Sequence, residues 1–241
     1  MQKITKNQVK FVRSLARKKV RDDEKMFVAE GEKCVSELMR SFELVIRADS
    51  SNATPLELEQ MSSLRTPQGV IAVFRQPEEP APDFAELAGK ELVLVLDGVQ
   101  DPGNLGTIIR TADWFGVHHI FCSYETADCW NSKVVQATMG ALARVHIHYA
   151  DLIDHISRVS PMTPVYGTLL DGRNIYEKAA LPQKQHGIII MGNEGNGISA
   201  ELRSLVTHPL LIPPFPQGAE TSESLNVSIA TAVILAEFRR P

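Results

Sequence analysis

The sequence predicts an α/β fold in which a small amino-terminal α/β domain precedes a larger domain built on a parallel sheet. After residue 90, short apolar runs alternate regularly with helical segments. Strands that are apolar at every position are typical of parallel sheets covered by helices on both faces. Three of these runs, ending near residues 96, 191 and 212, lead into turns rich in glycine, asparagine or proline. Ligands bind at the carboxyl ends of such strands, where bare backbone can hold a polar, flat cofactor, so we expect an enzyme.

A proline-rich stretch divides the chain. Residues 75–83 contain three prolines with acidic neighbours, a composition that favours an extended connector with few contacts. We therefore expect a small α/β domain over residues 1–75, a linker and lead-in over 76–89, and the sheet domain over 90–241.

In the small domain, a helix is predicted over residues 7–18, because its apolar and basic residues fall on separate faces. A strand at 27–31, a helix at 32–40 and strands at 44–48 and 70–74 follow. The last of these strands comes directly after a turn at 66–69, which its proline and glycine indicate.

In the sheet domain, the pattern predicts a regular alternation of strands and helices. The expected strands are residues 92–96, 119–122, 145–148, 165–169, 187–191 and 210–212. The expected helices are residues 104–115, 132–141, 152–158, 199–205 and 225–238.

Composition excludes several classes of protein. The formal net charge of the 241 residues is only −4, so no strong overall field attracts nucleic acid or an acidic membrane. The amino terminus is locally basic, however, with nine lysines and arginines against three acids in residues 1–26. This asymmetry fits either a local anionic partner or a solvated helix face. The longest nearly apolar run, residues 227–236, is too short to span a bilayer, and the amino terminus does not resemble a secretory signal.

The three cysteines form no C-x-x-C pair, which favours a reducing, cytoplasmic setting without disulfides. Histidines occur as His118-His119 and as His146 with His148, but no H-E-x-x-H spacing is present, so we expect packing roles and no metal site.

Two common nucleotide-binding motifs are excluded by spacing. A dinucleotide-binding domain needs G-x-G-x-x-G after its first strand, whereas the glycines after residue 96 stand at positions 98, 103 and 106. The glycines at 192, 195 and 197 are in the reverse order and late in the chain. Neither turn ends in Gly-Lys-Ser/Thr, so a P-loop is also excluded.

Three segments together resemble the signature motifs of the TrmH/SpoU branch of the SPOUT methyltransferases. They are Asp101-Pro-Gly-Asn104-x-Gly-x-x-x-Arg110, Met191-Gly-Asn-Glu194-Gly-x-Gly-Ile-Ser199, and Ile212-Pro-Pro with Glu223-Ser-Leu-Asn-Val-Ser228. The amino-terminal stretch, with its basic helix and Phe27-x-x-Glu-Gly31, resembles the ribosomal-protein-like RNA-binding domain that many members carry. The resemblance covers nearly the whole chain. One feature differs from short family members, a longer proline-rich lead over residues 213–222 that includes Gly218.

The resemblance implies transfer of a methyl group from S-adenosylmethionine to a ribose 2′-hydroxyl of structured RNA, either transfer RNA or ribosomal RNA. It also implies a carboxyl-terminal trefoil knot that holds the cofactor, and a homodimer formed through the knotted domain. Two alternatives remain open at this point, namely a non-catalytic RNA-binding protein on the same fold and methylation of a base.

The resemblance assigns catalytic roles to five residues. Arg110 acts on the ribose hydroxyl or the adjacent phosphate; since a guanidinium stays charged, we expect it to stabilise negative charge and not to accept a proton. Asn104 orients Arg110 or the ribose, or caps its helix. Glu194 organises the arginine or the RNA-facing side. Ser224 and Asn226 shape the pocket, and Ser224 is also a candidate helix cap.

The resemblance places the cofactor against backbone and apolar side chains, and RNA against the basic helix. The expected cofactor-binding residues are Thr168, Leu170, Gly192, Asn193, Gly197, Ile212 and Leu225. Glycine at 192 would let the chain approach the ligand closely. The expected RNA contacts are Lys10, Arg13, Arg17, Lys18 and Lys19, whose charges suit phosphate.

Overall fold

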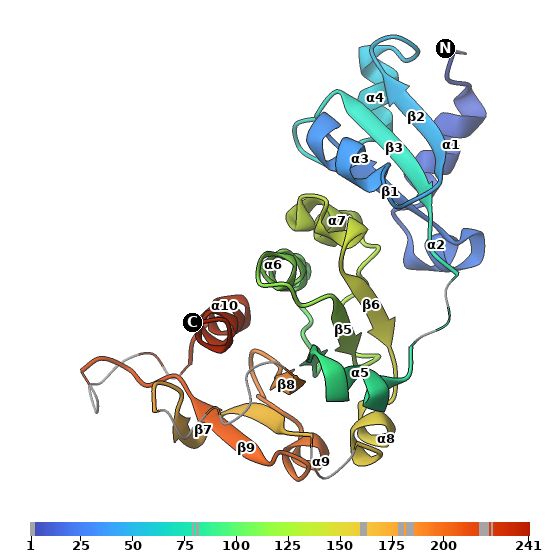
Figure 1. The fold of residues 1–241 in the computed structure, drawn as a ribbon. Coiled ribbons are helices and arrows are strands. Elements are labelled where there is room, and N and C mark those ends of the chain that lie inside the picture. Colours follow the sequence, from blue (N-terminus) through green and yellow to red (C-terminus); the bar gives the residue numbers. More distant parts are fainter. Residues whose placement is uncertain are drawn as a thin grey trace. The chain divides into compact units, whose positions relative to one another are not determined.

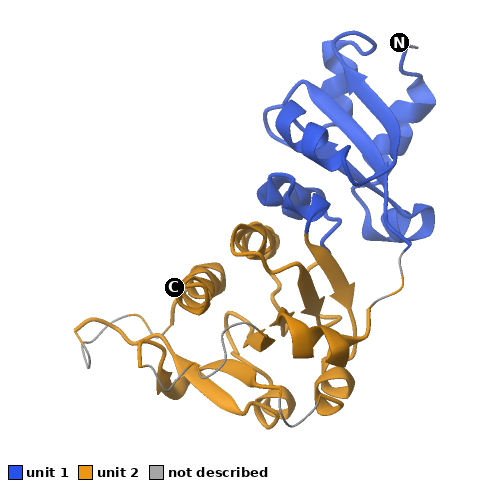
Figure 2. Cartoon of the chain, in the orientation of Figure 1, with its two compact units in different colours: residues 1–79, 128–144 blue, residues 80–127, 145–241 orange. Residues whose placement is uncertain are grey.

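The computed structural model describes residues 3–78, 80, 82–159, 163–177, 181, 186–216, 222 and 224–241. The chain forms two compact units (Figure 2). Unit 1 comprises Met1–Glu79 and Asp128–Arg144, and unit 2 comprises Pro80–Ala127 and Val145–Pro241. Residues 128–144 therefore pack with the amino-terminal part of the chain, although the sequence pattern groups them with the sheet domain.

Unit 1 is a three-stranded antiparallel sheet with helices (Figure 1). Strand β3 lies between β1 and β2, with Ala72 opposite both Ala29 and Arg47. The elements are α1 (Lys6–Ser14), α2 (Lys18–Glu24), β1 (Met26–Glu30), α3 (Glu32–Leu38), β2 (Leu44–Asp49), α4 (Pro55–Met61), β3 (Val70–Arg75), α7 (Ser132–Thr138) and a 3-10 helix (Ala141–Ala143).

The predicted helix at residues 7–18 is two helices. Helix α1 ends at Ser14, whose hydroxyl donates to the carbonyl of Phe11 at 2.7 Å, and α2 begins at Lys18. The apolar face is formed by Val9, Val12 and Leu15, which are buried against α4 and the sheet. The amphipathic pattern predicts the buried face correctly, but it contains no signal for the break at residues 15–17.

Unit 2 has a six-stranded parallel sheet in the order β6-β5-β4-β8-β7-β9, which confirms the predicted α/β architecture. Its elements are α5 (Phe84–Lys90), β4 (Leu92–Leu96), α6 (Pro102–Trp114), β5 (His119–Cys122), β6 (His146–Tyr149), α8 (Leu152–Ser157), β7 (Val165–Asn174), β8 (Gly187–Met191), α9 (Ala200–Arg203), β9 (His208–Leu211) and α10 (Val227–Phe238). The order changes direction between β4 and β8, so this pair forms the topological switch point.

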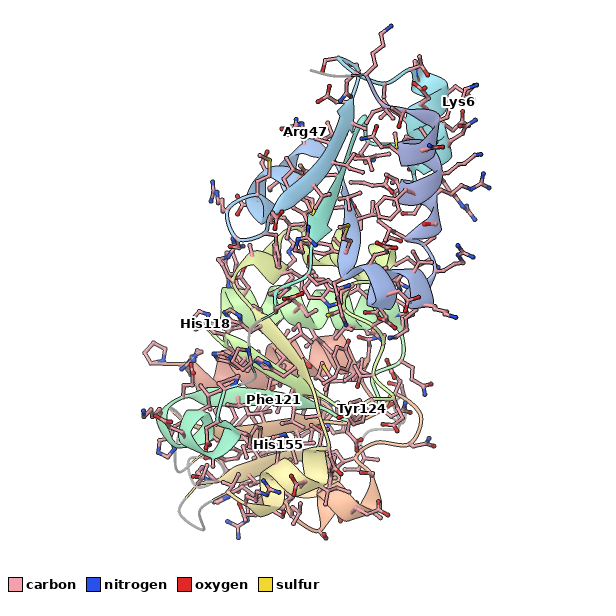
Figure 3. The ribbon with its side chains drawn as sticks, turned by 90° about the vertical axis from the view of Figure 1, so that its right-hand side faces the viewer. Lys6, Arg47, His118, Phe121, Tyr124 and His155 are labelled. Carbon is pink, nitrogen blue, oxygen red and sulfur yellow. The ribbon has the colours of Figure 1, made fainter. Side chains whose placement is uncertain are left out.

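Helices cover both faces of this sheet (Figure 1). On one face α5, α8 and α9 enclose a core that contains Phe84, Phe121 and Ile190. The Phe121 and His155 rings, 5.9 Å apart, both lie on this face (Figure 3). On the other face α6 packs against α10, and Phe238 meets Tyr166 edge to face at 4.8 Å. Burial on both faces explains why β4 and β8 are apolar at every position.

Three helices were not predicted: α2, α4 and α5. Helix α4 begins with a capping box in which the Thr54 hydroxyl and the Glu57 side chain each bind the other's backbone N–H. Its Thr-Pro-x-Glu sequence is a recognisable helix start, so α4 could have been found.

All three cysteines are buried and form no disulfide. In the described part of the chain no helix is long and apolar enough to cross a membrane.

Candidate functional site

The first and second motifs meet at the switch point of the sheet. Strands β4 and β8 run in register, with Leu96 beside Met191, and the backbone N–H of Asp97 continues the pairing by donating to the Met191 carbonyl at 2.9 Å. The turns that follow the two strands therefore emerge side by side. The Asp97 carboxylate also accepts from the N–H of Ser199 at 2.7 Å, which ties the first turn to the start of α9.

The turn after β8 closes on itself. Asn193 and Gly197 exchange two backbone hydrogen bonds, both of 2.9 Å. The side chain of Asn193 accepts from the N–H of Gly195 at 2.8 Å and donates to the carbonyl of Gly98 at 2.7 Å. Asn193 thus fixes its own turn and joins it to the turn after β4.

The turn itself explains why residue 192 is glycine. A Cβ at Gly192 would lie 2.2 Å from the carbonyl carbon of Gly197 and 2.4 Å from the nitrogen of Ile198. Atoms at these distances overlap, and because the obstacles are backbone they cannot rotate away. Close approach of the chain to itself therefore requires glycine, whatever its role toward a cofactor.

A chain of side-chain hydrogen bonds joins all three motifs. The amide nitrogen of Asn226 donates to the amide oxygen of Asn104 at 2.9 Å. The amide nitrogen of Asn104 in turn donates to a carboxylate oxygen of Glu194, also at 2.9 Å. Residues from α6, from the turn after β8 and from the start of α10 are thereby brought to one place.

The helix cap at α10 sets the direction of this chain. The amide oxygen of Asn226 accepts from the N–H and hydroxyl of Ser228, at 3.0 and 2.7 Å, and from the N–H of Ile229 at 3.4 Å. Since the oxygen is used by the helix, the nitrogen must face Asn104. Asn104 then presents its oxygen to Asn226 and its own nitrogen to Glu194, where a carboxylate suits an N–H donor.

Two predicted helix caps are corrected by the structure. Helix α6 is capped by Asp101, whose carboxylate accepts from the N–H of Asn104 at 2.8 Å, so the Asn104 side chain is not the cap. The Asp-Pro pair, with Pro102 in the first helical position, was the overlooked signal. Helix α10 is capped by Asn226 and not by Ser224. Ser224 is exposed and has no hydrogen bond to another described residue.

Arg110 lies six residues beyond Asn104 on α6, about 9 Å farther along the helix axis. Its side chain is exposed. Among the described residues the guanidinium has no hydrogen-bond or ion-pair partner, so it does not tie the helix to the sheet. Glu194 therefore contacts Asn104 and not the arginine, and Arg110 stays available for an anionic ligand.

Of the remaining cofactor candidates, Ile212 follows β9 and Leu225 precedes the cap of α10, whereas Thr168 and Leu170 lie within β7, although Leu170 was predicted to follow that strand. The Thr168 hydroxyl donates to the Ile190 carbonyl at 3.3 Å, which links β7 to β8. Leu170 is 75% exposed, Leu225 is 49% exposed, and Ile212 is half-buried just past β9. Exposed apolar side chains such as these suit a flat, partly apolar group such as adenine. The residues present therefore fit S-adenosylmethionine. Gly218 and Glu223 lie outside the described residues.

A cavity of about 520 Å³ lies on the other side of the switch point, at the ends of β4, β5 and β6. Asp97, Ser123 and Tyr124 contribute to its lining. Of the predicted cofactor residues, only Asn193 and Gly197 line it. This cavity is thus a neighbour of the predicted cofactor site and does not coincide with it.

The predicted RNA contacts are all exposed side chains of unit 1. Lys10 and Arg13 lie on α1, whereas Arg17 precedes α2 and Lys18 and Lys19 form its first turn. Lys18 is paired with Asp22 at 2.8 Å, so part of its charge is already neutralised.

The histidines at the sheet edge pack against one another. His119 stacks on His146 and His148, and its Nδ1 lies 3.2 Å from Nε2 of His148. Burial lowers the pKa of His148 to about 4 and also lowers the pKa of His119. Both rings are therefore neutral at pH 7 and share one hydrogen bond. The described residues contain no group of three or more His, Cys, Asp or Glu side chains arranged to hold a metal ion.

Known families match both parts of the chain. Residues 91–236 match the model of the SpoU rRNA Methylase family, and residues 6–49 match the MRM3-like substrate binding domain. The chain belongs to the SpoU rRNA methylase family. The predicted family and the predicted amino-terminal substrate-binding domain are thus confirmed.

Relatives of full length support this assignment. The chain is 33% identical to "23S rRNA (guanosine(2553)-2′-O)-methyltransferase RlmP" of Bacillus subtilis (strain 168), over 97% of each protein. Among solved structures, a protein assigned as an RNA methyltransferase of the TrmH family from Porphyromonas gingivalis is 38% identical, with a TM-score of 0.85 and 98% of each chain covered. An AdoMet-bound rRNA methyltransferase from Sinorhizobium meliloti is 29% identical, with a TM-score of 0.83, covering 99% of this chain and 96% of that one. This SpoU family member is therefore an RNA methyltransferase that uses S-adenosylmethionine.

Proposed function

We propose that this protein methylates a ribose 2′-hydroxyl of large-subunit ribosomal RNA, with guanosine as the first nucleotide to test. The observation that carries the proposal is the hydrogen-bonded chain from Asn226 through Asn104 to Glu194, with Arg110 on the same helix as Asn104 and without a partner among the described residues. The full-length likeness to a 23S rRNA guanosine 2′-O-methyltransferase supports the choice of substrate.

The chemistry requires that the ribose hydroxyl be aligned and lose its proton as it attacks. When bound, S-adenosylmethionine supplies the electrophilic methyl group. Arg110 keeps its charge, so it stabilises the negative charge that develops on the ribose oxygen and holds the adjacent phosphate. Asn104 binds one oxygen of Glu194 and leaves the other to accept a hydrogen bond, and then the proton, from the ribose hydroxyl. Because both amides of the chain are fixed by the cap of α10, this carboxylate is positioned before substrate arrives.

Transfer of a labelled methyl group from S-adenosylmethionine to 23S rRNA, 16S rRNA or transfer RNA tests the proposal. The labelled RNA is then hydrolysed in alkali. A ribose methylated at the 2′-oxygen protects the following phosphodiester, so the label should be recovered in a dinucleotide. Label in mononucleotides would mean base methylation, and no transfer to 23S rRNA would refute the proposed substrate.

Arg110→Ala should lower kcat/KM by about 10²- to 10³-fold, the usual loss when one charge-stabilising donor is removed. Arg158→Ala is the matched control, because Arg158 is also exposed but is paired with Asp154 on α8. An Arg110 variant as active as that control would contradict the assigned role.

We further propose that α10 is covered by a second copy of the chain. The helix is apolar nearly all round, yet Ile229 is 53% exposed, and Ala232 and Val233 are partly exposed. A helix with this composition is normally buried on all sides. Ile229→Asp should shift the mass measured by light scattering from dimer to monomer. Ile153→Asp, on α8, should leave the mass unchanged. A wild-type monomer would refute the dimer.

A trefoil knot at the carboxyl terminus remains part of this proposal. It is supported by the insertion of β8 between β4 and β7 and by the packing of α10 on α6, the helix that carries the first motif.

RNA affinity is proposed to come from the cations of unit 1. Replacing Arg17, Lys18 and Lys19 together by alanine should weaken binding and reduce the slope of log affinity against log salt by about one for each phosphate that the variant no longer binds. Because Lys18 is already paired with Asp22, Lys18→Ala alone should change the slope least. An unchanged slope in the triple variant would count against these contacts.

A further inference from the structure

Unit 1 contains a second cavity, of about 510 Å³, between the carboxyl-terminal half of α1, the helix α4 and the segment that begins at Asp128. Arg13, Gln60, Ser63 and Trp130 are among the residues that line it. Trp130 comes from a part of the chain that matches the methylase family, so the cavity exists only because residues 128–144 fold back onto the substrate-binding unit.

One wall of this cavity is fixed by a buried ion pair. Arg21 is only 3% exposed and binds the carboxylate of Asp128 through two nitrogens, at 2.6 and 3.2 Å. Its remaining nitrogen donates to the carbonyls of Leu15 and Ala16, at 2.7 and 2.8 Å. Asp128 also accepts from the N–H of Trp130 at 2.9 Å. The end of α1 and the tryptophan are thereby held to a common point.

The opposite wall is fixed by a buried carboxylate. Glu30, at the end of β1, is 2% exposed. It accepts from the hydroxyl of Ser62 at 2.6 Å and from both the N–H and the hydroxyl of Ser63 at 2.7 Å. A buried carboxylate is tolerated only with such partners, so the loop after α4 cannot move without losing them. Both walls are therefore in place before any ligand binds.

The lining combines an immobilised aromatic ring with an available cation. Trp130 packs on Phe27 at 4.6 Å and meets Phe42 edge to face at 5.9 Å, which fixes the indole while leaving it partly exposed. Arg13 is exposed and has no ion-pair partner in the described part of the chain. Lys10, three residues earlier on α1, lies on the same helix face.

We propose that this cavity binds one unpaired nucleotide of the RNA substrate, with the base against Trp130 and its phosphate on Arg13. Aromatic rings bind any base through its π face, and arginine binds the phosphate, which together are the usual means of holding single-stranded RNA. Glu59 and Gln60 on the rim offer an acceptor and a mixed donor and acceptor to the base edge. The inference rests on the proposed function for the identity of the polymer as RNA.

The two tryptophans of the chain make the test direct. Trp114 is 84% exposed on α6, in unit 2, so a Trp114→Phe protein retains Trp130 as its only indole. This protein is titrated with a fluorescently labelled single-stranded RNA of about 12 nucleotides, within the span that one binding domain covers, and with the perfect duplex of the same sequence. Tryptophan emission reports stacking, and anisotropy of the label reports binding. We expect the single strand to quench Trp130, and the duplex to bind without quenching.

Arg13→Ala in the same background should weaken single-strand binding by about tenfold, within the range that one stacked and phosphate-bound nucleotide contributes. Lys6→Ala is the matched control, because it removes one charge from the same helix but lies about two turns before Arg13 and outside the cavity lining. It should weaken binding by less than about threefold, as expected for one exposed charge.

Single-stranded RNA that binds without quenching, or that fails to bind, would overturn the inference, as would equal effects of the two variants. Labelled methyl transfer to 23S rRNA is measured on the same preparation. Quenching without methyl transfer would support the cavity while contradicting the proposed function. Methyl transfer without quenching would support the proposed function and contradict the binding of a nucleotide in this cavity.

Discussion

Replacing Asn226 by aspartate separates the two roles that this side chain has in the structure. Its oxygen caps α10, and its nitrogen starts the chain of hydrogen bonds to Glu194. Aspartate caps a helix about as well as asparagine does, so the first role is retained. The second is lost, because a carboxylate oxygen would face the Asn104 oxygen across the 2.9 Å now bridged by an N–H.

The consequence passes to Glu194. Asn104 can restore its hydrogen bond with residue 226 only by rotating its amide, which then turns an oxygen toward the Glu194 carboxylate at 2.9 Å. Without the rotation, the amide–amide hydrogen bond is lost and two oxygens face each other. With the rotation, the hydrogen bond to the Glu194 carboxylate is lost, which is worth about 1.5–3 kcal/mol when shielded and about 1 kcal/mol at this exposed site. Misplacing a reacting group by about 1 Å can lower the rate about 100-fold. We therefore expect kcat/KM to fall by about 10- to 100-fold.

The assay compares Asn226→Asp with Asn226→Ala. Urea unfolding should show the aspartate protein within about 0.5 kcal/mol of wild type, whereas alanine, which removes the cap, should cost about 1 kcal/mol. Methyl transfer should be impaired in both. Wild-type activity in the aspartate protein, at any stability, would refute the reasoning that the amide chain positions Glu194.

Three further predictions concern stability. Arg21→Ala should destabilise unit 1 by about 3 kcal/mol in urea, since it removes the ion-pair partner of the largely buried Asp128 carboxylate, and adding Asp128→Ala should restore part of the loss. The pKa of His148 falls from 6.5 to about 4 on folding. Between these pH values the unfolded chain therefore binds a proton at His148 that the folded chain does not bind. Stability should therefore decline from pH 6.5 toward pH 4, and less so in His148→Gln; equal slopes would contradict this. Gly192→Ala should lower the Tm even without cofactor, and an unchanged Tm would contradict the backbone overlap.

Strands of the parallel sheet were the most predictable part of the fold. β4, β5 and β8 were predicted to the residue, because each is a mostly apolar run bounded by polar or glycine residues. Strand β7, by contrast, continues to Asn174, five residues past its predicted end. Its last two residues, Arg173 and Asn174, are polar and pair with Leu210 and Leu211 of β9, a long-range contact that local pattern does not contain.

The residues of the site could be predicted from the sequence, but the hydrogen bonds between them could not. Asn104, Glu194 and Asn226 were selected by motif, yet the partner of each is 90 or 122 residues away. Sequence reasoning paired Glu194 with Arg110 or with RNA. Which of several polar groups meet depends on where the turns leave the sheet, and that is set by the β4–β8 register.

The helix caps explain how such a network can be held at an exposed surface. Exposed polar pairs are weak when each side chain must be ordered for that contact alone. Asn226 is already ordered because it caps α10, and Asn104 sits in the first turn of α6, where Asp101 binds its backbone. Helix formation therefore already accounts for most of the entropic cost of ordering these side chains. The packing of α6 against α10 favours helix formation. The hydrogen bonds from Asn226 through Asn104 to Glu194 then require little further loss of side-chain entropy. On this argument Asn104 and Asn226 stand at helix starts because there a short polar side chain can be both exposed to substrate and fixed in direction.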